Sequence, residues 1–336
     1  MFSGYVTYTS PMQKSQHSTF VWIAEPQDVP AASAPIAFWS NGGPGCSGLF
    51  GMGFENGPFV AQPDGTLAYS AFPWNRKMTM VWFEQPVGVG FSFSSNPADY
   101  QNLNDDIAAT DNAAFLSAFF AQFPQYQNNP LWLTSESYGG NYVPQMSRQV
   151  LQGADARLAA QLSKGGFIVG NPVFSADSTN ATFANIMNLV TPSILLGHSL
   201  IPVRFYDTFY EAGCAVLNPP SDPCDALTTE MFQLAGPCFQ SNACSDDLYQ
   251  SPYGNATLGP DTVTTPDVDA LWTTYLNRAD VQAAIHAQKP AAPWSDCANI
   301  GYTITWPSNI PDYEGVCVCV CVCVHRRHWK AALARL

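Results

Sequence analysis

The segment Leu131-Trp-Leu-Thr-Ser-Glu-Ser137-Tyr-Gly-Gly140 decides the fold, because it predicts a buried strand, a tight turn and a helix in immediate succession. A serine on such a turn presents its hydroxyl above the edge of a sheet, and the tight turn needs small residues two positions before and after it. Gly139 meets that need, and Ser135 meets it with more strain. The segment therefore favours Ser137 as a nucleophile, with an ordinary serine in a glycine-rich turn as the alternative.

A second segment, Trp39-Ser-Asn41-Gly42-Gly43-Pro44-Gly45-Cys46, shifts the balance towards catalysis. A strand that ends in two glycines and a proline exposes backbone N–H groups at the carboxyl edge of the sheet. Acyl-transfer enzymes use such groups as an oxyanion hole, and each donor contributes roughly 10²–10³ in rate. The residue after the serine, Tyr138, would supply another N–H group. The two segments together predict an acyl-transfer site.

The rest of the chain predicts an α/β protein. Apolar runs that alternate with turns and amphipathic stretches are typical of a sheet with crossover helices. The predicted strands cover residues 19–24, 35–39, 78–83 and 131–134, and the predicted helices cover residues 103–123, 143–152 and 271–287. Aromatic residues recur at helical spacing in 103–123, which predicts that they belong to the core.

Charge and hydropathy exclude several classes of function. The 13 Lys and Arg residues face 26 Asp and Glu residues, so the net charge of −13 argues against a nucleic-acid partner. We expect no membrane span, because no stretch of 18 apolar residues exists. The first residues, Met1 to Tyr5, do not read as a signal peptide. No metal site and no cofactor are predicted.

Cysteine usage indicates an oxidising compartment. Four of the ten cysteines lie in the alternating run Val316 to Val324, and the other six are Cys46, Cys214, Cys224, Cys238, Cys244 and Cys297. Six widely spaced cysteines fit a disulfide framework. The glycosylation sequons at Asn180 and Asn255 agree with secretion.

Composition divides the chain into four regions. Residues 1–177 read as the N-terminal part of the core, and residues 178–270 read as an insertion or cap held by disulfides more than by packing. Residues 271–315 read as a helical segment that starts the return to the core. Residues 316–336 form a Val-Cys and basic tail.

Several motifs occur in a characteristic order along the chain. They are Phe2-Ser-Gly-Tyr-Val6, the turn 39–46, Phe54-Glu55-Asn-Gly-Pro-Phe59, Gln85-Pro-Val-Gly-Val-Gly-Phe-Ser92, the segment 135–144, and Trp294-Ser-Asp-Cys297. In this order they resemble the serine carboxypeptidase family of α/β-hydrolase enzymes. The resemblance implies an α/β-hydrolase sheet with helices on both faces and a disulfide-rich insertion (cap) domain.

The same resemblance implies a function. A secreted, vacuolar or lysosomal serine carboxypeptidase would hydrolyse C-terminal residues from peptides and proteins through an acyl-enzyme on Ser137. Gly43 and Tyr138 would supply the oxyanion N–H groups, and Cys46 would pair with Cys297. The other four body cysteines allow three pairings, among which the sequence does not choose.

The resemblance also implies a site for the terminal carboxylate of the substrate. Its residues would be Trp39, Asn41, Gly42, Glu55 and Glu136. Two acids facing an anionic substrate end can bind it only if a proton is retained between them. We therefore expect peptidase activity in an intact homologue to be highest in acid.

The family pattern continues with an Asp after a strand ending in Gly-Asp and a His in a Gly-His turn, and neither segment follows here. The resemblance fades at residues 306–314, so we expect C-terminal core strands to be missing. We also expect activity to be low, because a serine nucleophile needs a base to take its proton. His198 and His286 read as structural or surface residues.

The tail carries its own hypothesis. Alternating Val and Cys codons arise from a dinucleotide repeat read in one frame, so residues 316–324 are interpreted as translated simple-repeat sequence. The alternatives are a Cys-x-Cys metal tail with His325 and His328, and an apolar strand. Two other functions remain open for the whole chain: an acyltransferase of the same family, and a non-catalytic secreted binding protein.

Overall fold

The computed structural model describes residues 1–173, 191–197, 199–216, 220–235, 268–288, 292–306, 308–309 and 311–313. Two compact units divide the chain. One unit comprises Met1–Ser175 and Val268–Leu336, and the other comprises Ala176–Asp267. Both glycosylation sequons, Cys238, Cys244, His198 and the tail with its Val-Cys run lie outside the described residues.

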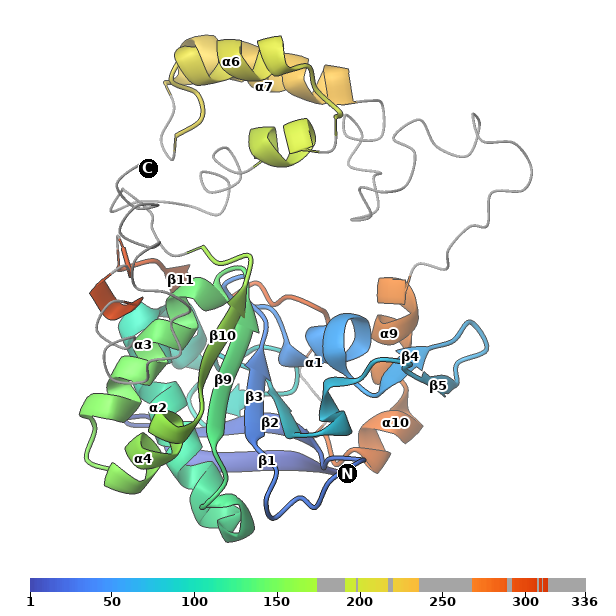
Figure 1. Cartoon of the computed structure of the whole chain (residues 1–336), viewed down its shortest axis with the longest axis vertical. Helices are drawn as coiled ribbons and strands as arrows, with labels where there is room; N and C mark the ends of the chain where they lie inside the picture. The colour runs from blue at the N-terminus through green and yellow to red at the C-terminus, as the bar shows by residue number, and fades with distance from the viewer. Residues whose placement is uncertain are drawn as a thin grey trace. The chain divides into compact units, whose positions relative to one another are not determined.

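The first unit is built on a seven-stranded mixed sheet with the order β1-β2-β6-β3-β9-β10, in which β7 also pairs with β2 (Figure 1). β1, β2 and β6 are antiparallel neighbours, whereas β6, β3, β9 and β10 run parallel. The bounds are β1 Phe2–Thr9, β2 Gln16–Ala24, β3 Ile36–Ser40, β6 Thr79–Phe83, β7 Phe93–Ser94, β9 Leu131–Glu136 and β10 Gly166–Gly170. The four predicted strands are thus confirmed, each to within a few residues.

Alternate side chains of the central strands bury two hydrophobic layers, as the period of two in a strand requires. On one face, Ile23, Phe38 and Phe83 pack with residues of α2 (Asp105–Gln122), α3 (Gly139–Gln152) and α4 (Ala156–Lys164). On the other face, Trp22 and Trp82 pack with residues of α1 (Gly48–Gly51), α9 (Val268–Leu276) and α10 (Ala279–Ala284). Helices therefore cover both faces of the sheet, as Figure 1 shows.

Helix α2 confirms the predicted aromatic core stripe. The side chain of Asn104 caps the helix by accepting a hydrogen bond from the N–H of Ile107 (2.9 Å). Phe115 and Phe119 are fully buried against the sheet. Each buried phenylalanine contributes about 1.5–3 kcal/mol through its removal from water.

The single helix predicted over residues 271–287 is wrong, because the chain breaks between α9 and α10. Arg278 is extended (ψ 132°). The side chain of Asn277 accepts a hydrogen bond from the N–H of Trp294 and donates one to its carbonyl, both at 2.8 Å. This pairing with a distant segment competes with the helix. The helix predicted from residue 143 begins four residues earlier, at Gly139.

The remaining elements of the first unit are short. They are the π-helix Met52–Asn56, the hairpin β4 Phe59–Ala61 and β5 Leu67–Tyr69, the 3₁₀ helices Trp74–Arg76, Pro97–Gln101 and Pro124–Tyr126, and the parallel pair β8 Leu103–Asn104 and β11 Tyr302–Thr303. The β8–β11 pair connects the start of α2 to the segment that follows Cys297.

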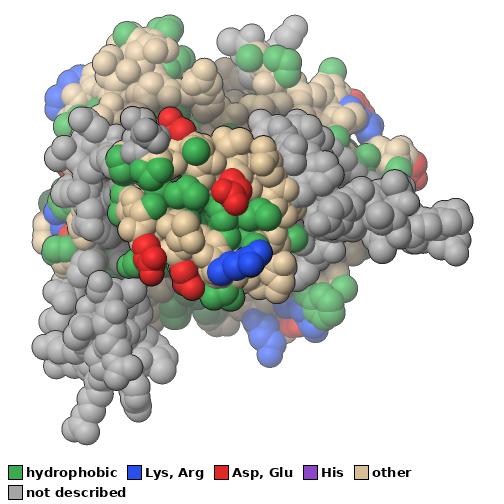
Figure 2. All heavy atoms as spheres, turned by 90° about the horizontal axis from the view of Figure 1, so that it is seen from above, with side chains coloured by type: hydrophobic (Ala, Val, Ile, Leu, Met, Phe, Trp, Pro, Cys, Tyr) green, Lys and Arg blue, Asp and Glu red, His purple; other side chains and the backbone are tan. Residues whose placement is uncertain are grey.

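The described part of the second unit contains α6 Val203–Glu211 and α7 Ser221–Ala235. Cys214, which follows the end of α6, forms a disulfide with Cys224 of α7. Phe205, Phe209 and Met231 are buried in a separate small core. Figure 2 shows one face of the described helices, on which hydrophobic, acidic and basic side chains are mixed. None of the described helices has the length and hydropathy that crossing a bilayer requires.

Candidate active site

Ser137 occupies a strained turn between β9 and α3. Its φ is +53°, in the left-handed region that costs a non-glycine residue about 1–2 kcal/mol. Three hydrogen bonds hold the residue there: its N–H donates to Gly170 O (3.0 Å), and its carbonyl accepts from the N–H groups of Gly140 (3.0 Å) and Val173 (2.8 Å). The Ser137 side chain remains partly exposed. The turn thus presents a hydroxyl to solvent on a backbone that is fixed from both sides.

Two glycines are required by close packing around this turn. A Cβ atom on Gly139 would lie 2.0 Å from Ser135 Oγ, which shows why small residues flank the serine on both sides. A Cβ atom on Gly42 would lie 2.4 Å from the backbone nitrogen of Tyr138 and 3.0 Å from Ser137 Cβ. The glycine turn that follows β3 therefore rests directly on the serine turn that follows β9.

Two backbone N–H groups at this junction have no acceptor among the described residues. Gly43 has φ +105°, accessible to glycine and strained for other residues. Within the described residues, the N–H groups of Gly43 and Tyr138 donate no hydrogen bond, whereas Gly42 N–H donates to Glu136 Oε1 (3.1 Å). Free donors beside a hydroxyl are what an oxyanion requires.

The residues predicted to bind a carboxylate lie together. Asn41 is buried, and its Oδ1 accepts hydrogen bonds from Trp39 Nε1 (2.9 Å) and Gly51 N (3.0 Å). Its Nδ2 therefore points at the two acids, donating to Glu55 Oε1 (2.9 Å) and Glu136 Oε1 (3.4 Å). We call Trp39, Asn41, Gly42, Glu55 and Glu136 the carboxylate set.

The electrostatics of the carboxylate set favour a retained proton. The side chain of Glu55 still reaches solvent, but partial burial raises its pKa, and the nearby charge of Glu136 adds to that rise. The hydrogen bond from Asn41 opposes the shift and does not cancel it. Glu55 therefore stays protonated to a higher pH than an isolated glutamate.

A disulfide and a buried acid stabilise the end of the glycine turn that follows β3. Cys46 is bonded to Cys297, 251 residues later in the chain. Glu84 is fully buried and accepts hydrogen bonds from Ser47 Oγ (2.6 Å), Trp294 Nε1 (2.7 Å) and Phe91 N (2.6 Å). Burial raises the pKa of Glu84 to about 7 against the effect of these donors. Sequence reasoning missed Glu84, although an acid directly after an apolar strand was an available signal.

The described histidines do not contact Ser137. His17 is fully buried, with Nε2 3.2 Å from Asp99 Oδ2 and Nδ1 3.0 Å from Asp111 Oδ2. Burial alone would lower the pKa of His17, but the two carboxylates outweigh it and raise the pKa. Burial would likewise raise the pKa of Asp99, but its hydrogen bonds and His17 lower it. Sequence reasoning missed this buried histidine cluster.

His286, predicted on a helical pattern, instead lies just beyond α10 with φ +59° and an exposed side chain. Among the described residues no cluster of His, Cys, Asp and Glu could hold a metal ion.

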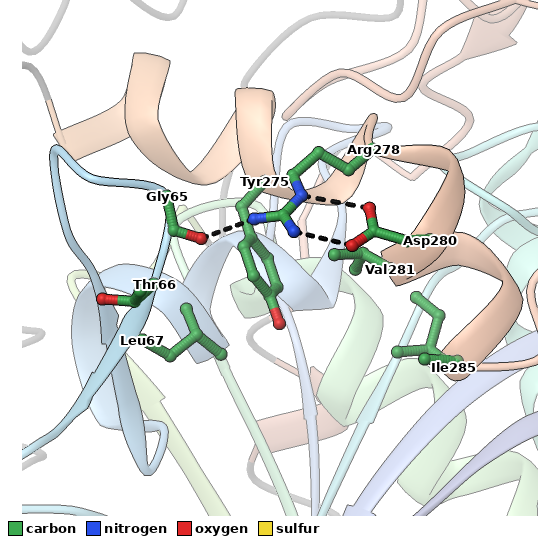
Figure 3. A pocket seen from close by; sticks show the side chains of 9 residues that line it. Gly65, Thr66, Leu67, Tyr275, Arg278, Asp280, Val281 and Ile285 are labelled. Atoms are coloured by element: carbon green, nitrogen blue, oxygen red, sulfur yellow. Dashed lines mark hydrogen bonds and ion pairs between the residues drawn. The ribbon is translucent and has the colours of Figure 1, made fainter.

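A pocket of about 340 Å³ opens elsewhere on the first unit, between the β4–β5 hairpin and α9–α10. Figure 3 shows Arg278 at its centre, donating to Gly65 O (2.6 Å) and to both carboxylate oxygens of Asp280 (3.1 and 2.6 Å). No predicted site residue lines this pocket. The guanidinium is already paired, and the lining mixes polar residues with apolar ones such as Leu67, Val281 and Ile285.

The mixed sheet, the strained serine turn and the free N–H groups define the class of α/β-hydrolase-like proteins. The fold resembles a solved prohormone-processing carboxypeptidase, Kex1(delta)p from Saccharomyces cerevisiae, with a TM-score of 0.61 and 18% identity over 88% of this chain and 66% of that one. A family model described as serine carboxypeptidase matches residues 1–313. The chain therefore belongs to the serine carboxypeptidase family.

Curated relatives agree with this assignment. Serine carboxypeptidase-like 46 of Arabidopsis thaliana is 33% identical over 319 residues, which cover 89% of this chain and 64% of the relative. Serine carboxypeptidase-like 26 of Oryza sativa subsp. japonica is 40% identical over 176 residues, which cover 51% of this chain and 36% of the relative. The chain thus spans a little under two thirds of the length of the first of these relatives.

Proposed function

We propose that the described site acts on peptides as part of a serine carboxypeptidase. Ser137 Oγ would attack the carbonyl carbon of the last peptide bond, and the N–H groups of Gly43 and Tyr138 would bind the oxygen that becomes negative. The leaving amino acid would carry the terminal carboxylate, held by the carboxylate set. Water would then hydrolyse the ester on Ser137 and restore the hydroxyl.

The position of Gly42 is the observation that carries this proposal. Its Cα supports the serine turn, while its N–H holds Glu136 of the carboxylate set. A single residue therefore joins the nucleophile to the acids that would bind the substrate end. A substrate whose terminal carboxylate is bound by these acids would have its last peptide bond, one residue away, next to Ser137. Hydrolysis of the last peptide bond requires this placement.

The raised pKa of Glu55 makes substrate binding depend on pH. A carboxylate can accept a hydrogen bond from Glu55 only while Glu55 keeps its proton. Binding is therefore strong below the pKa of Glu55 and weakens as the pH rises through it. We expect affinity for a free C-terminus to be higher at about pH 4.5 than at about pH 7.5.

Catalysis needs a base in addition to these groups. A serine hydroxyl attacks well only when a neighbouring group takes its proton. Within the described residues, no histidine forms a hydrogen bond with Ser137, since His17 is held by two acids and His286 lies exposed beyond α10. We therefore expect the described site to bind peptide C-termini and, with its own groups alone, to hydrolyse them slowly.

The test compares two peptides that differ only at the end. A peptide with a free terminal carboxylate should bind the 336-residue protein at about pH 4.5, and its C-terminal amide should bind at least tenfold more weakly in calorimetry. Equal affinity for the two peptides would contradict a carboxypeptidase site and favour an acyltransferase or another binding function. Labelling by a fluorophosphonate probe, with Ser137→Ala as control, measures activation of the hydroxyl. Labelling as fast as in an active serine carboxypeptidase would refute the slow-hydrolysis expectation.

We also propose that the protein functions in an oxidising compartment, such as the secretory route or a vacuole. The disulfides Cys46–Cys297 and Cys214–Cys224, both between described residues, support this.

A further inference from the structure

Asp105 is a buried carboxylate on which five hydrogen bonds converge. It is the first residue of α2 and has no exposed surface. Oδ1 accepts from the hydroxyls of Tyr138 (2.7 Å) and Tyr302 (3.0 Å). Oδ2 accepts from Thr305 N (2.6 Å), Thr305 Oγ1 (3.2 Å) and Trp306 N (3.1 Å). These donors offset the cost of burying the carboxylate, and the positive N-terminal end of the α2 dipole adds to their effect.

These donors come from two separate parts of the chain. Tyr302, Thr305 and Trp306 belong to the segment after Cys297, which pairs with β8 next to Asp105. Tyr138 belongs to the serine turn and is the residue that follows the nucleophile. Asp105 therefore ties the serine turn to α2 and to residues 302–306.

Tyr138 is anchored at the far end of its ring. Its side chain is 1% exposed and packs edge-on against Tyr142 (5.1 Å between ring centroids) and Tyr302 (5.9 Å). Its hydroxyl is held by Asp105, and its backbone nitrogen faces the turn at Gly42. With the hydroxyl and ring fixed, the backbone of this residue has little freedom to rotate.

We propose that Asp105 is a positioning residue for the oxyanion donor. Its carboxylate holds the hydroxyl of Tyr138, and the anchored side chain keeps the Tyr138 N–H directed at the place where the acyl oxygen would lie. This inference rests on the proposed function for the use of that N–H. Donors must be oriented before the reaction to stabilise developing charge, and a small misplacement costs a large part of the effect.

Hydrogen exchange tests the link with a matched pair of variants. Tyr138→Phe and Tyr302→Phe each remove one hydroxyl from the same oxygen of Asp105, but only the first belongs to the serine turn. Three amides report on that turn: Gly140 N–H donates to Ser137 O, and the N–H groups of Asn141 and Tyr142 donate to Tyr138 O. In Tyr138→Phe, exchange in peptides spanning residues 138–142 should be at least fivefold faster, and in Tyr302→Phe less than twofold faster.

The outcomes separate a positioning role from a purely structural one. If Asp105 served only to hold residues 302–306, Tyr138→Phe would leave exchange at 138–142 unchanged, which overturns the proposal. Equal acceleration of exchange at residues 138–142 in both variants also overturns it, because such a result would show that loss of either hydroxyl destabilises the whole region.

If Tyr138→Phe does not fold, Asp105→Asn and Thr305→Ala decide. The first should accelerate exchange at both 138–142 and 302–306, and the second only at 302–306. An Asp105→Asn variant that leaves exchange at 138–142 unchanged overturns the proposal. Failure of the wild-type protein to bind a free peptide C-terminus would contradict the proposed function, while the exchange contrast still reports on the Asp105 link.

Discussion

Replacing Gly139 by alanine should destabilise the serine turn by a measurable and specific amount. The new Cβ atom would lie 2.0 Å from Ser135 Oγ and 2.3 Å from Ser135 Cβ, well inside van der Waals contact. Ser135 cannot swing away freely, because its Oγ donates a 2.6 Å hydrogen bond to Ser40 O on β3. The new side chain must therefore push β9 and α3 apart or break that bond.

The magnitude follows from the cost of overpacking. Extra methyl groups in a tight interior cost about 1–3 kcal/mol. Displacing the Ser135–Ser40 bond adds about 1 kcal/mol, and the better helix propensity of alanine returns up to about 1 kcal/mol. We expect a net loss of about 2 kcal/mol, which lowers Tm by about 4–8 °C for a domain of this size.

Thermal and urea unfolding of four variants measure this effect: Gly139→Ala, Gly170→Ala, Ser135→Gly and the double variant Ser135→Gly with Gly139→Ala. Gly170→Ala is the matched control, since its Cβ atom would meet only Glu136 Cβ at an ordinary 3.8 Å. Ser135→Gly combined with Gly139→Ala should recover part of the loss, giving a coupling of about 1 kcal/mol in the double-mutant cycle. Equal Tm values for Gly139→Ala and Gly170→Ala would refute the packing argument.

Three further predictions concern pH and the disulfide. The pKa of His17 is raised above its usual value of about 6.5, so the stability that its positive charge contributes is complete below pH 6.5 and is lost as the pH rises through the raised pKa. The pKa of Asp99 is lowered, so the stability that its negative charge contributes is lost only when strong acid protonates it. His17→Gln should cost about 3–5 kcal/mol at pH 5 in urea unfolding and flatten the decline in stability that the wild type shows as the pH rises above about 6.5, and an unchanged slope would contradict the role of the cluster. Glu55→Gln should bring the ratio of peptide affinities at pH 4.5 and 7.5 close to one in calorimetry, whereas a ratio like that of the wild type would exclude Glu55 as the titrating group. Cys46→Ala should lower the free energy of unfolding in urea by about 2–5 kcal/mol, and an unchanged value would contradict a stabilising role for the Cys46–Cys297 bond.

Local patterns in the sequence predicted the central strands and the serine turn well, because each depends on neighbouring residues. The elements that were missed depend on distant partners. β10 contains two glycines and lies at the edge of the described sheet, so its sequence lacks the full apolar run of a central strand. The break between α9 and α10 depends on Asn277 reaching Trp294, a contact that no helical period reveals.

The candidate site shows the same division. The family motifs predicted which residues make up the carboxylate set. They did not predict which of these residues hydrogen-bond to each other, and only the structure shows this. Asn41 is oriented by Trp39, and so it turns its amide nitrogen towards both acids. The buried cluster of His17, Asp99 and Asp111 joins residues far apart in the chain, so spacing alone could not identify it.

The disulfide between Cys46 and Cys297 also imposes an order in time. A ribosome adding about 5–20 residues per second needs roughly 10–50 s to pass from one cysteine to the other, a separation of 251 residues. Trp272 and Trp294, which cover the second face of the sheet, emerge towards the end of the same interval. The nascent chain therefore carries an apolar sheet face that its own later residues have not yet covered, and Cys46 has to wait for the same late segment before its partner Cys297 is made.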